Sequence, residues 1–431
     1  MEQLLHYIWK HKIFPLRRLE TTDGLSVEVI DPGLHNGDAG PDFFNAKVRI
    51  GGTMWVGNIE IHDRSSDWYA HGHHRDSRYD NVILHIAATV DSEVRTSNGN
   101  TLPQMRLEVP PGVSSNYERL LHEDRYPPCH KLIPHLPSIS VHSWMSALQT
   151  ERLEQKTEAI YARVARFVTL ARNYGFGTNS EAFETWALNM PMTHIARHRD
   201  DIFQTEALFL GQAGLLSADS MPERQREAAL SDGYFVRLSG EYRYLAHKFS
   251  LTPTDFRLWK FLRLRPQNFP HIRIAQLASL YHSRRTSLSM IAECPTLDGA
   301  RRMLTASVTP YWRTHYTFGH ESRESAKTLS RQSVDLLIIN TVVPMLFAYG
   351  RHLSSEEMCW RATDFLEQLA PERNNIVRMW EDCGLEVQNA GDTQALIQLK
   401  KNYCDRKDCL RCRFGYEYLR RREAPAAKVT D

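Results

Sequence analysis

Two carboxylates and a histidine near the start of the chain have the types and spacing of a metal site. Asp42 follows Pro41, and Glu60 stands on an apolar segment two residues before His62. A carboxylate is costly to bury unless a cation or another partner neutralises it. Acids at the ends of adjacent strands can hold a hard divalent cation such as Mg²⁺. The pattern predicts a metal-dependent site that cleaves phosphodiester bonds, with nucleic acid as the substrate.

The segments around these residues have the composition of an α/β region. The predicted elements are a helix at 2–14, strands at 25–30, 43–50 and 54–61, a helix at 67–79, and strands at 81–90 and 104–109. Gly51 and Gly52 predict a tight turn between the second and third strands. Asp42 and Glu60 are therefore expected on neighbouring strands.

The order helix, three strands, helix, strand, with Pro41-Asp42 on one strand and Glu60-Ile61-His62 on the next, resembles the PD-(D/E)xK nuclease superfamily. The resemblance implies a restriction-endonuclease-like core and Mg²⁺-dependent cleavage of nucleic acid. It implies that Asp42 and Glu60 bind the metal and orient an attacking water, with Glu2 as an accessory acid. His62 stands where the family usually has lysine. It is expected to act as a base or a phosphate contact, or to mark an impaired core.

The chain as a whole also resembles a bacterial family whose domain has no assigned function. The segments that carry this resemblance, besides the first helix, are 36–43, 57–62, 66–74 and 79–85. It extends over nearly the full length and implies no particular chemistry.

A group of histidines supports a different interpretation. His71, His73 and His74 begin like the zinc motif of metallo-β-lactamase-like hydrolases, although Asp76 does not follow in that motif's order. They predict a zinc hydrolase as one alternative, accessory residues of the nuclease site as another, and surface or capping histidines as a third. His85, on the strand at 81–90, is expected in the core or as a further accessory residue.

The overall charge favours a further alternative. Lys and Arg number 53 and Asp and Glu 51, so the net charge is +2 and any nucleic-acid surface must be local. Together with His62 in place of lysine, this fits a non-catalytic nucleic-acid-binding or scaffold protein that keeps a degenerate nuclease fold. That alternative predicts an Arg or Lys beside Glu60.

A cysteine knuckle near the C-terminus is the second specific motif. Cys404, Cys409 and Cys412 follow a C-x4-C-x2-C spacing, and cationic neighbours favour their thiolate forms. A closed tetrahedral site needs a fourth ligand. Cys383 is nearest in sequence and Cys129 is the long-range alternative. We expect a structural zinc, with an iron–sulfur cluster or unmetallated thiols as the alternatives.

The rest of the chain is predominantly helical. The predicted organisation is an α+β chain with a nuclease-like α/β domain at 1–135, a helical domain at 136–385, the cysteine knuckle at 386–421 and a flexible tail at 422–431. Arg265 and Arg273 are candidate substrate-binding residues, because arginine beside aromatic side chains suits a nucleic-acid backbone. The alternative is that these arginines are internal braces.

Composition favours a cytoplasmic protein with no membrane association. The first residues lack the pattern of a signal peptide, and the uncharged run at 336–350 is too short to span a bilayer. Seven cysteines, three of them within nine residues, suit metal binding in a reducing compartment.

Overall fold

The computed structural model describes residues 2–14, 18–162, 166–283, 290 and 293–421. The chain divides into two compact units, of which the first contains residues 1–141, 383–385 and 400–431 and the second contains 142–382 and 386–399. Of the predicted knuckle at 386–421, residues 400–421 with the three cysteines belong to the same unit as the N-terminal strands, and 386–399 belong to the second unit. The predicted tail at 422–431 lies outside the described residues.

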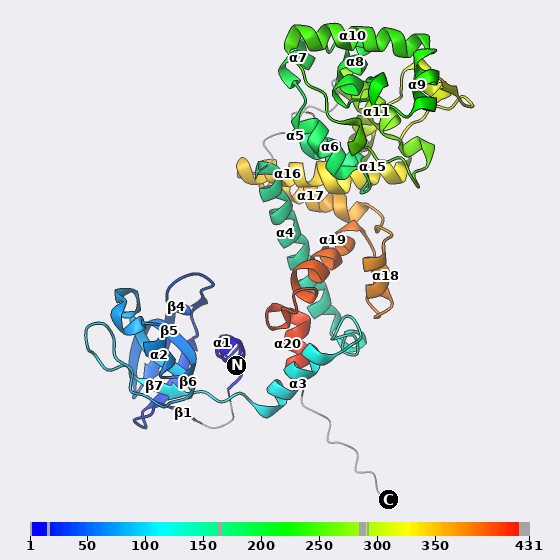
Figure 1. Ribbon diagram of the computed structural model, residues 1–431. Coiled ribbons are helices and arrows are strands. Elements are labelled where there is room, and N and C mark those ends of the chain that lie inside the picture. Colours follow the sequence, from blue (N-terminus) through cyan, green and yellow to red (C-terminus); the bar gives the residue numbers. More distant parts are fainter. Residues whose placement is uncertain (1, 15–17, 163–165, 284–289, 291–292, 422–431) are drawn as a thin grey trace, which may run out of the picture. The chain divides into compact units, whose positions relative to one another are not determined.

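A mixed sheet of seven strands forms the centre of the first unit (Figure 1). Its strands are β1 (Leu19–Glu20), β2 (Ser26–Asp31), β3 (Leu34–His35), β4 (Phe43–Ile50), β5 (Thr53–Arg64), β6 (Val82–Thr89) and β7 (Gln104–Arg106). The spatial order is β1-β2-β4-β5-β6-β7, and β3 pairs with β4. The strands β2, β4 and β5 are antiparallel, whereas β6 is parallel to β5 and β7 to β6. The α+β class is confirmed: a mixed sheet comes first and helices follow.

A bulge at the start of β4 sets the position of Asp42. Phe43, Ala46 and Val48 are fully buried on β4. Buried residues on a regular strand are two positions apart, but Phe43 and Ala46 are three apart. The pairing with β5 shifts register between Phe43 and Ala46, and Asn45 has a left-handed φ of 55°. Such an extra residue bends a strand and redirects its neighbouring side chains.

The first helix, α1 (Glu2–Lys10), contacts β5 through an apolar face. Leu5, Ile8 and Trp9 are fully buried, and the Trp9 indole donates a 3.0 Å hydrogen bond to the carbonyl of Pro32. The helix ends at Lys10, short of the predicted residue 14. Lys12 has a left-handed φ of 51°, which a regular helix cannot accommodate.

The second predicted helix is broken into three short pieces, so the prediction of one continuous helix was wrong. These are α2 (Asp67–Ala70) and two 3₁₀ turns, η1 (His73–Arg75) and η2 (Ser77–Tyr79). Gly72 separates α2 from η1 with a left-handed φ of 78°. This break turns the chain so that His71 and His73 fall on different pieces.

Further helical segments belong to the first unit. They include α3 (Pro111–His122), the 3₁₀ turns η3 (Ile133–His135) and η9 (Cys409–Arg411), and α20 (Arg413–Leu419). Buried Asn116 on α3 donates to the carbonyls of Tyr418, Leu419 and Arg421, at 3.4, 3.2 and 3.0 Å. These bonds satisfy carbonyls at the end of α20, which lack partners within their own helix.

The second unit is helical and has its own hydrophobic core. Its main helices, coloured green through orange in Figure 1, are α5 (Arg166–Tyr174), α6 (Ser180–Leu188), α7 (Met192–Arg197), α8 (Ile202–Gln212), α9 (Glu223–Leu230), α10 (Gly233–Phe249), α11 (Pro270–His282), α13 (Leu297–Leu304), α15 (Arg331–Leu337), α16 (Val343–His352), α17 (Glu356–Gln368), α18 (Asn375–Glu381) and α19 (Ala390–Gln398). Before them, α4 (Ser138–Ala162) begins at the boundary between the units.

One helical stretch in the second unit passes a length and composition test for membrane spanning. Arg331–His352 has 22 residues, longer than the uncharged run recognised in the sequence, and 72% of its apolar window is buried within the structure. A buried core helix of a soluble protein passes the same test.

At Gly57 the strand β5 comes very close to the start of β6. A Cβ atom there would lie 2.4 Å from Ile83 Cγ2 and 2.8 Å from the Asn81 carbonyl oxygen. We expect Gly57→Ala to lower the free energy of unfolding by about 1–3 kcal/mol through overpacking. Gly112→Ala on α3, where the added methyl meets nothing within 4 Å, should leave it unchanged or slightly raised. Thermal unfolding measures both, and a Gly57→Ala melting temperature equal to that of the wild type would contradict this packing.

Candidate metal centre

The strand β5 places Glu60 and His62 on the same face of the sheet, because side chains two residues apart on a strand point the same way. Both are buried, at 4% and 2% exposure. In the parallel pairing with β6, Glu60 lies opposite His85. Both α1 and α2 contact β5, so the two helical segments that flank this strand contribute further side chains.

Asp42 and Glu60 are joined by two reciprocal hydrogen bonds. The backbone N–H of Asp42 donates to Glu60 Oε2 over 3.1 Å, and the N–H of Ile61 donates to Asp42 Oδ2 over 2.8 Å. The two predicted acids therefore meet where β4 begins beside β5. Each carboxylate is held by a backbone donor of the other strand, which fixes its orientation.

Three imidazoles gather beside the Glu60 carboxylate. His73 Nε2 lies 3.2 Å and His62 Nε2 3.6 Å from Glu60 Oε1, and His71 Nδ1 lies 3.2 Å from His62 Nε2. The potential ligand atoms of His62, His71 and His73 all lie within 4.8 Å of one another. We call Asp42, Glu60, His62, His71 and His73 the acid–histidine cluster.

The cluster has the donors and spacing of a divalent transition-metal site. Nitrogen and oxygen ligands bind Zn²⁺ at about 2.0–2.1 Å, so neighbouring ligands of a tetrahedral ion lie roughly 3.4 Å apart. The separations of 3.2, 3.2 and 3.6 Å between cluster atoms are close to this value. His62 Nδ1 lies 2.8 Å from His85 Nε2, a contact that can fix the His62 tautomer with Nε2 free to bind.

The electrostatics of the cluster are dominated by burial. Burial, reinforced by the charge of Asp42, raises the pKa of Glu60 to about 9. Burial, together with the charges of His85, His73 and His71, lowers the pKa of His62 to about 2. A neutral imidazole is the form that binds a metal, and a divalent cation would restore the charged form of the carboxylate.

His6 is a member of this neighbourhood that the sequence analysis did not identify. Its Nε2 lies 3.3 Å from Asp42 Oδ2. Burial opposes protonation of His6, but the hydrogen bond and charge of Asp42 outweigh it, so its pKa is raised. His6 is one helical turn from Glu2 on α1, and that spacing is the signal that could have found it.

The remaining predicted accessory residues differ in their positions. Burial raises the pKa of Glu2. The charges of His6 and His71 oppose this shift, and the charge of Asp42 adds to it. His85 contacts His62, and burial followed by the charge of His73 lowers the His85 pKa to about 4. The ring of His74 instead lies against Tyr69, at 5.0 Å, outside the His62–His71–His73 trio.

The cysteines of the knuckle lie in the first unit together with both candidates for a fourth ligand. Burial, followed by the nearby thiols of Cys412, Cys409 and Cys383, raises the pKa of Cys129. Burial raises the pKa of Cys404, with Cys412, Cys129 and Cys409 as its thiol neighbours. Cys129 is therefore a neighbour of all three knuckle cysteines, although Cys383 was the first choice from the sequence.

The two arginines predicted to bind substrate lie in the second unit, and for Arg273 the prediction was wrong. Arg273 is buried, and its guanidinium donates to Asn268 and Gln276 at 2.6 and 3.1 Å and stacks on Phe176. These contacts make it an internal brace. Arg265 is exposed at the start of a 3₁₀ turn.

A comparison with protein families gives one match. The family model described as "Protein of unknown function (DUF2851)" matches residues 2–375. The chain belongs to this family. The match covers the acid–histidine cluster and most of the second unit, and it ends before the cysteine knuckle. No curated protein and no solved structure matches the chain.

Glu60→Gln tests the electrostatics of the metal-free cluster. The pKa of Glu60 is raised from its ordinary value to about 9 on folding, so its contribution to stability is complete below pH 4.5 and is lost as the pH rises through 9. In a chelator, wild-type stability should fall by up to about 1.4 kcal/mol per pH unit from this group. Glu60→Gln should remove that slope.

Thermal unfolding between pH 7 and 9 provides the measurement, because burial lowers the pKa values of His62, His73 and His85 and these imidazoles are neutral throughout that range. The control is Glu28→Gln, an exposed carboxylate on β2 that pairs with Arg49, which should keep the wild-type slope. Equal slopes for Glu60→Gln and the wild type would contradict the assignment of a neutral, buried Glu60.

Proposed function

We propose that this chain is a metal-dependent phosphodiesterase that cleaves nucleic acid at the acid–histidine cluster. The observation that carries the proposal is the environment of Glu60. Its buried carboxylate adjoins Asp42, and its partners in the described part of the chain are imidazoles, with no Lys or Arg among them. A carboxylate in such a place is stabilised by a cation. The scaffold alternative required a permanent basic partner at this position.

The topology of the first unit supports the resemblance to PD-(D/E)xK nucleases. After α1, the antiparallel strands β2, β4 and β5 are followed by the helical crossover that contains α2 and then by parallel β6. Apart from the two-residue strands β1 and β3, and with short helical pieces in place of the second helix, this resembles the order helix, three strands, helix, strand, with Asp42 directly before β4 and Glu60 on β5.

The donor set points to Mn²⁺ or Zn²⁺ in preference to Mg²⁺. Imidazole nitrogen binds transition metals well, whereas Mg²⁺ prefers oxygen ligands and retains water. Glu60, His62, His71 and His73 would hold the ion, and Asp42 would complete its oxygen ligands or orient water. When bound there, the cation would polarise a phosphoryl oxygen and make water more acidic.

The protein residues have distinct tasks in this proposal. His62, with its pKa near 2, stays neutral and so cannot supply the permanent positive charge of the family's lysine. It serves as a ligand positioned by His85. His6, with its raised pKa, holds Asp42 and supplies positive charge beside it. His71 is exposed and stands at the solvent side of the cluster, where substrate would enter.

A zinc hydrolase with a non-phosphate substrate is the second candidate. The convergence of three imidazoles favours it, with His62 in place of the predicted His74. The two candidates differ in Asp42, which the phosphodiesterase requires and a three-histidine zinc site does not.

A cleavage assay tests the proposed function. Chelator-treated protein is reloaded with Mg²⁺, Mn²⁺ or Zn²⁺ and incubated with single- and double-stranded DNA and RNA. We expect cleavage with Mn²⁺ or Zn²⁺ that falls at least about 100-fold in Asp42→Ala, Glu60→Ala and His71→Ala. The controls Glu28→Ala and His320→Ala remove an exposed acid and an exposed imidazole elsewhere and should stay within about twofold of the wild type.

Cleavage that survives in both Asp42→Ala and Glu60→Ala would refute the assignment. Loss of cleavage in His71→Ala with full activity in Asp42→Ala would refute the role assigned to Asp42, and no cleavage of any nucleic acid by the wild type with any of the three metals would favour the hydrolase with a non-phosphate substrate.

We also propose that Cys129, Cys404, Cys409 and Cys412 hold a structural zinc. Four thiolates close a tetrahedral zinc site and leave no position for water, so this ion would stabilise the fold and take no part in cleavage. The ion would offset the mutual repulsion of thiolates and the effect of burial, which raises the pKa of Cys409 to about 11.

Elemental analysis of protein purified without added metal tests this site. We expect Cys409→Ser and Cys129→Ser each to lose about one zinc per chain and to unfold at a lower temperature. Cys359→Ser, a half-buried thiol of the second unit, is the matched control and should keep the wild-type zinc content. Zinc retained in Cys129→Ser and lost in Cys383→Ser would show that Cys383 is the fourth ligand, and a wild type without metal would refute the site.

A further inference from the structure

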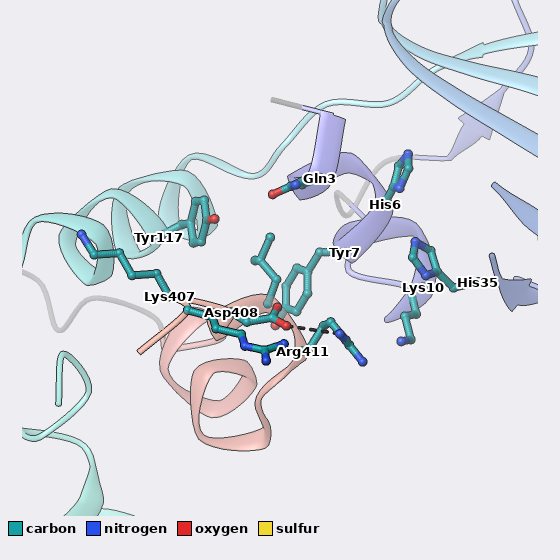
Figure 2. Close-up of a pocket in the computed structure, with 11 residues that line it drawn as sticks. Gln3, His6, Tyr7, Lys10, His35, Tyr117, Lys407, Asp408 and Arg411 are labelled. Atoms are coloured by element: carbon teal, nitrogen blue, oxygen red, sulfur yellow. Dashed lines mark hydrogen bonds and ion pairs between the residues drawn. The ribbon is translucent and has the colours of Figure 1, made fainter. Parts of the chain in front are cut away.

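A cleft in the first unit lies between α1, α3 and the segment 406–411 (Figure 2). Its volume is about 410 Å³. Gln3, His6, Tyr7 and Lys10 line it from one face of α1, at the spacing of three and four residues that places side chains on the same helical face. Gln3 and Tyr7 extend from α1 toward α3 and the loop. We call this hollow the basic cleft.

Positive charge dominates the lining of the basic cleft. It contains Lys10, Arg406, Lys407 and Arg411 and one acid, Asp408, which pairs with Arg411 at 3.3 Å. Lys407 Nζ donates to the carbonyl of Leu121 at 3.2 Å. Among the residues that the structure describes, no salt-bridge partner is found for Lys10 or Arg406. In a chain of net charge +2, this is a local concentration of cations of the kind that binds phosphate.

The cleft also offers an aromatic side chain. Tyr117 of α3 lines it and is half-buried, and burial raises the pKa of its hydroxyl, so the side chain is neutral at physiological pH. Cations that follow a backbone, together with an aromatic ring on which a base can stack, are the features of a site for single-stranded nucleic acid.

The basic cleft adjoins the acid–histidine cluster through His6. His6 lines the cleft, and its Nε2 lies 3.3 Å from Asp42 Oδ2. His35 of β3, which also lines the cleft, lies with its ring 5.6 Å from that of His6 and pairs in the sheet with Phe43, the residue after Asp42. A ligand in the cleft would therefore lie next to His6, the residue that contacts Asp42.

We infer that the basic cleft binds the phosphates and a terminal base of a single-stranded nucleic-acid end that leads into the acid–histidine cluster. The inference rests on the proposed function for its choice of ligand. A volume of about 410 Å³ suits one small ligand or a short stretch of one strand and excludes a duplex. Lys10 and Arg406 contact phosphates, and Tyr117 stacks on the base.

Binding of a fluorescently labelled single-stranded oligonucleotide of about ten nucleotides, measured by anisotropy in EDTA, tests the inference without any cleavage. Lys10→Ala/Arg406→Ala should weaken binding about tenfold or more. It should also reduce the slope of log affinity against log salt by about 1.4, the value for two lost phosphate contacts on a single strand. The control Lys47→Ala/Lys401→Ala removes two exposed lysines outside the cleft lining and should bind with wild-type affinity and slope.

Substitutions at Tyr117 test the base-stacking step. Tyr117→Ala should weaken binding about tenfold, whereas Tyr117→Phe, which keeps the ring, should bind like the wild type. Circular dichroism and thermal unfolding confirm that each variant is folded. Lys10→Glu reverses one charge at an exposed position and should weaken binding more than Lys10→Ala.

Wild-type affinity in Lys10→Ala/Arg406→Ala, or an equal loss in the control pair, would overturn the inference. Tighter binding of a matched duplex than of the single strand would overturn it also. Asp42→Ala separates this test from that of the proposed function. If Asp42→Ala loses cleavage and still binds the oligonucleotide, and Lys10→Ala/Arg406→Ala also binds normally, the proposed function is supported and the inference about the cleft is refuted. Strong, cleft-dependent binding without any cleavage by the wild type would support the inferred binding site and refute the proposed enzymatic function.

Discussion

Burial of the Glu60 carboxylate is the constraint on which the organisation of the first unit depends. A charged carboxylate at 4% exposure is unfavourable by several kcal/mol unless something compensates it. The protein surrounds it with a backbone donor from Asp42 and imidazoles from His62 and His73. Imidazoles whose pKa is lowered by burial are neutral, so they suit the role of metal ligands and do not form a permanent ion pair with Glu60. The chemistry that we propose follows from this choice of neighbours.

The geometry of the sheet makes this gathering possible. The bulge at the start of β4 brings Asp42 beside Glu60, and the parallel pairing of β5 with β6 brings His85 behind His62. The break at Gly72 divides the crossover segment, so that the two histidines on either side of it turn toward one ligand position. Irregular backbone, at a bulge and a broken helix, therefore positions the cluster on a rigid sheet.

The return of the C-terminal segment to the first unit connects the two other candidate sites. The knuckle supplies thiols to the proposed zinc site on one side and Arg406, Lys407 and Arg411 to the basic cleft on the other. A zinc ion that orders this segment would also fix the cations of the cleft. The proposed metal at the knuckle and the inferred binding of a nucleic-acid end would in this way depend on the same segment.

The sequence by itself determined the α+β class, the main strands and the expectation that Asp42 and Glu60 lie on neighbouring strands, because these follow from local periodicity and from an acid on an apolar strand. It identified Glu2 on the first helix but missed His6, and it grouped His74 with His71 and His73. It also predicted one helix at 67–79 and a substrate role for Arg273. Only the tertiary structure decided which imidazoles lie beside Glu60, which thiols lie near the knuckle cysteines and where a cleft forms. These depend on a bulge, a left-handed glycine and contacts between segments hundreds of residues apart, none of which leaves a periodic signal in the chain.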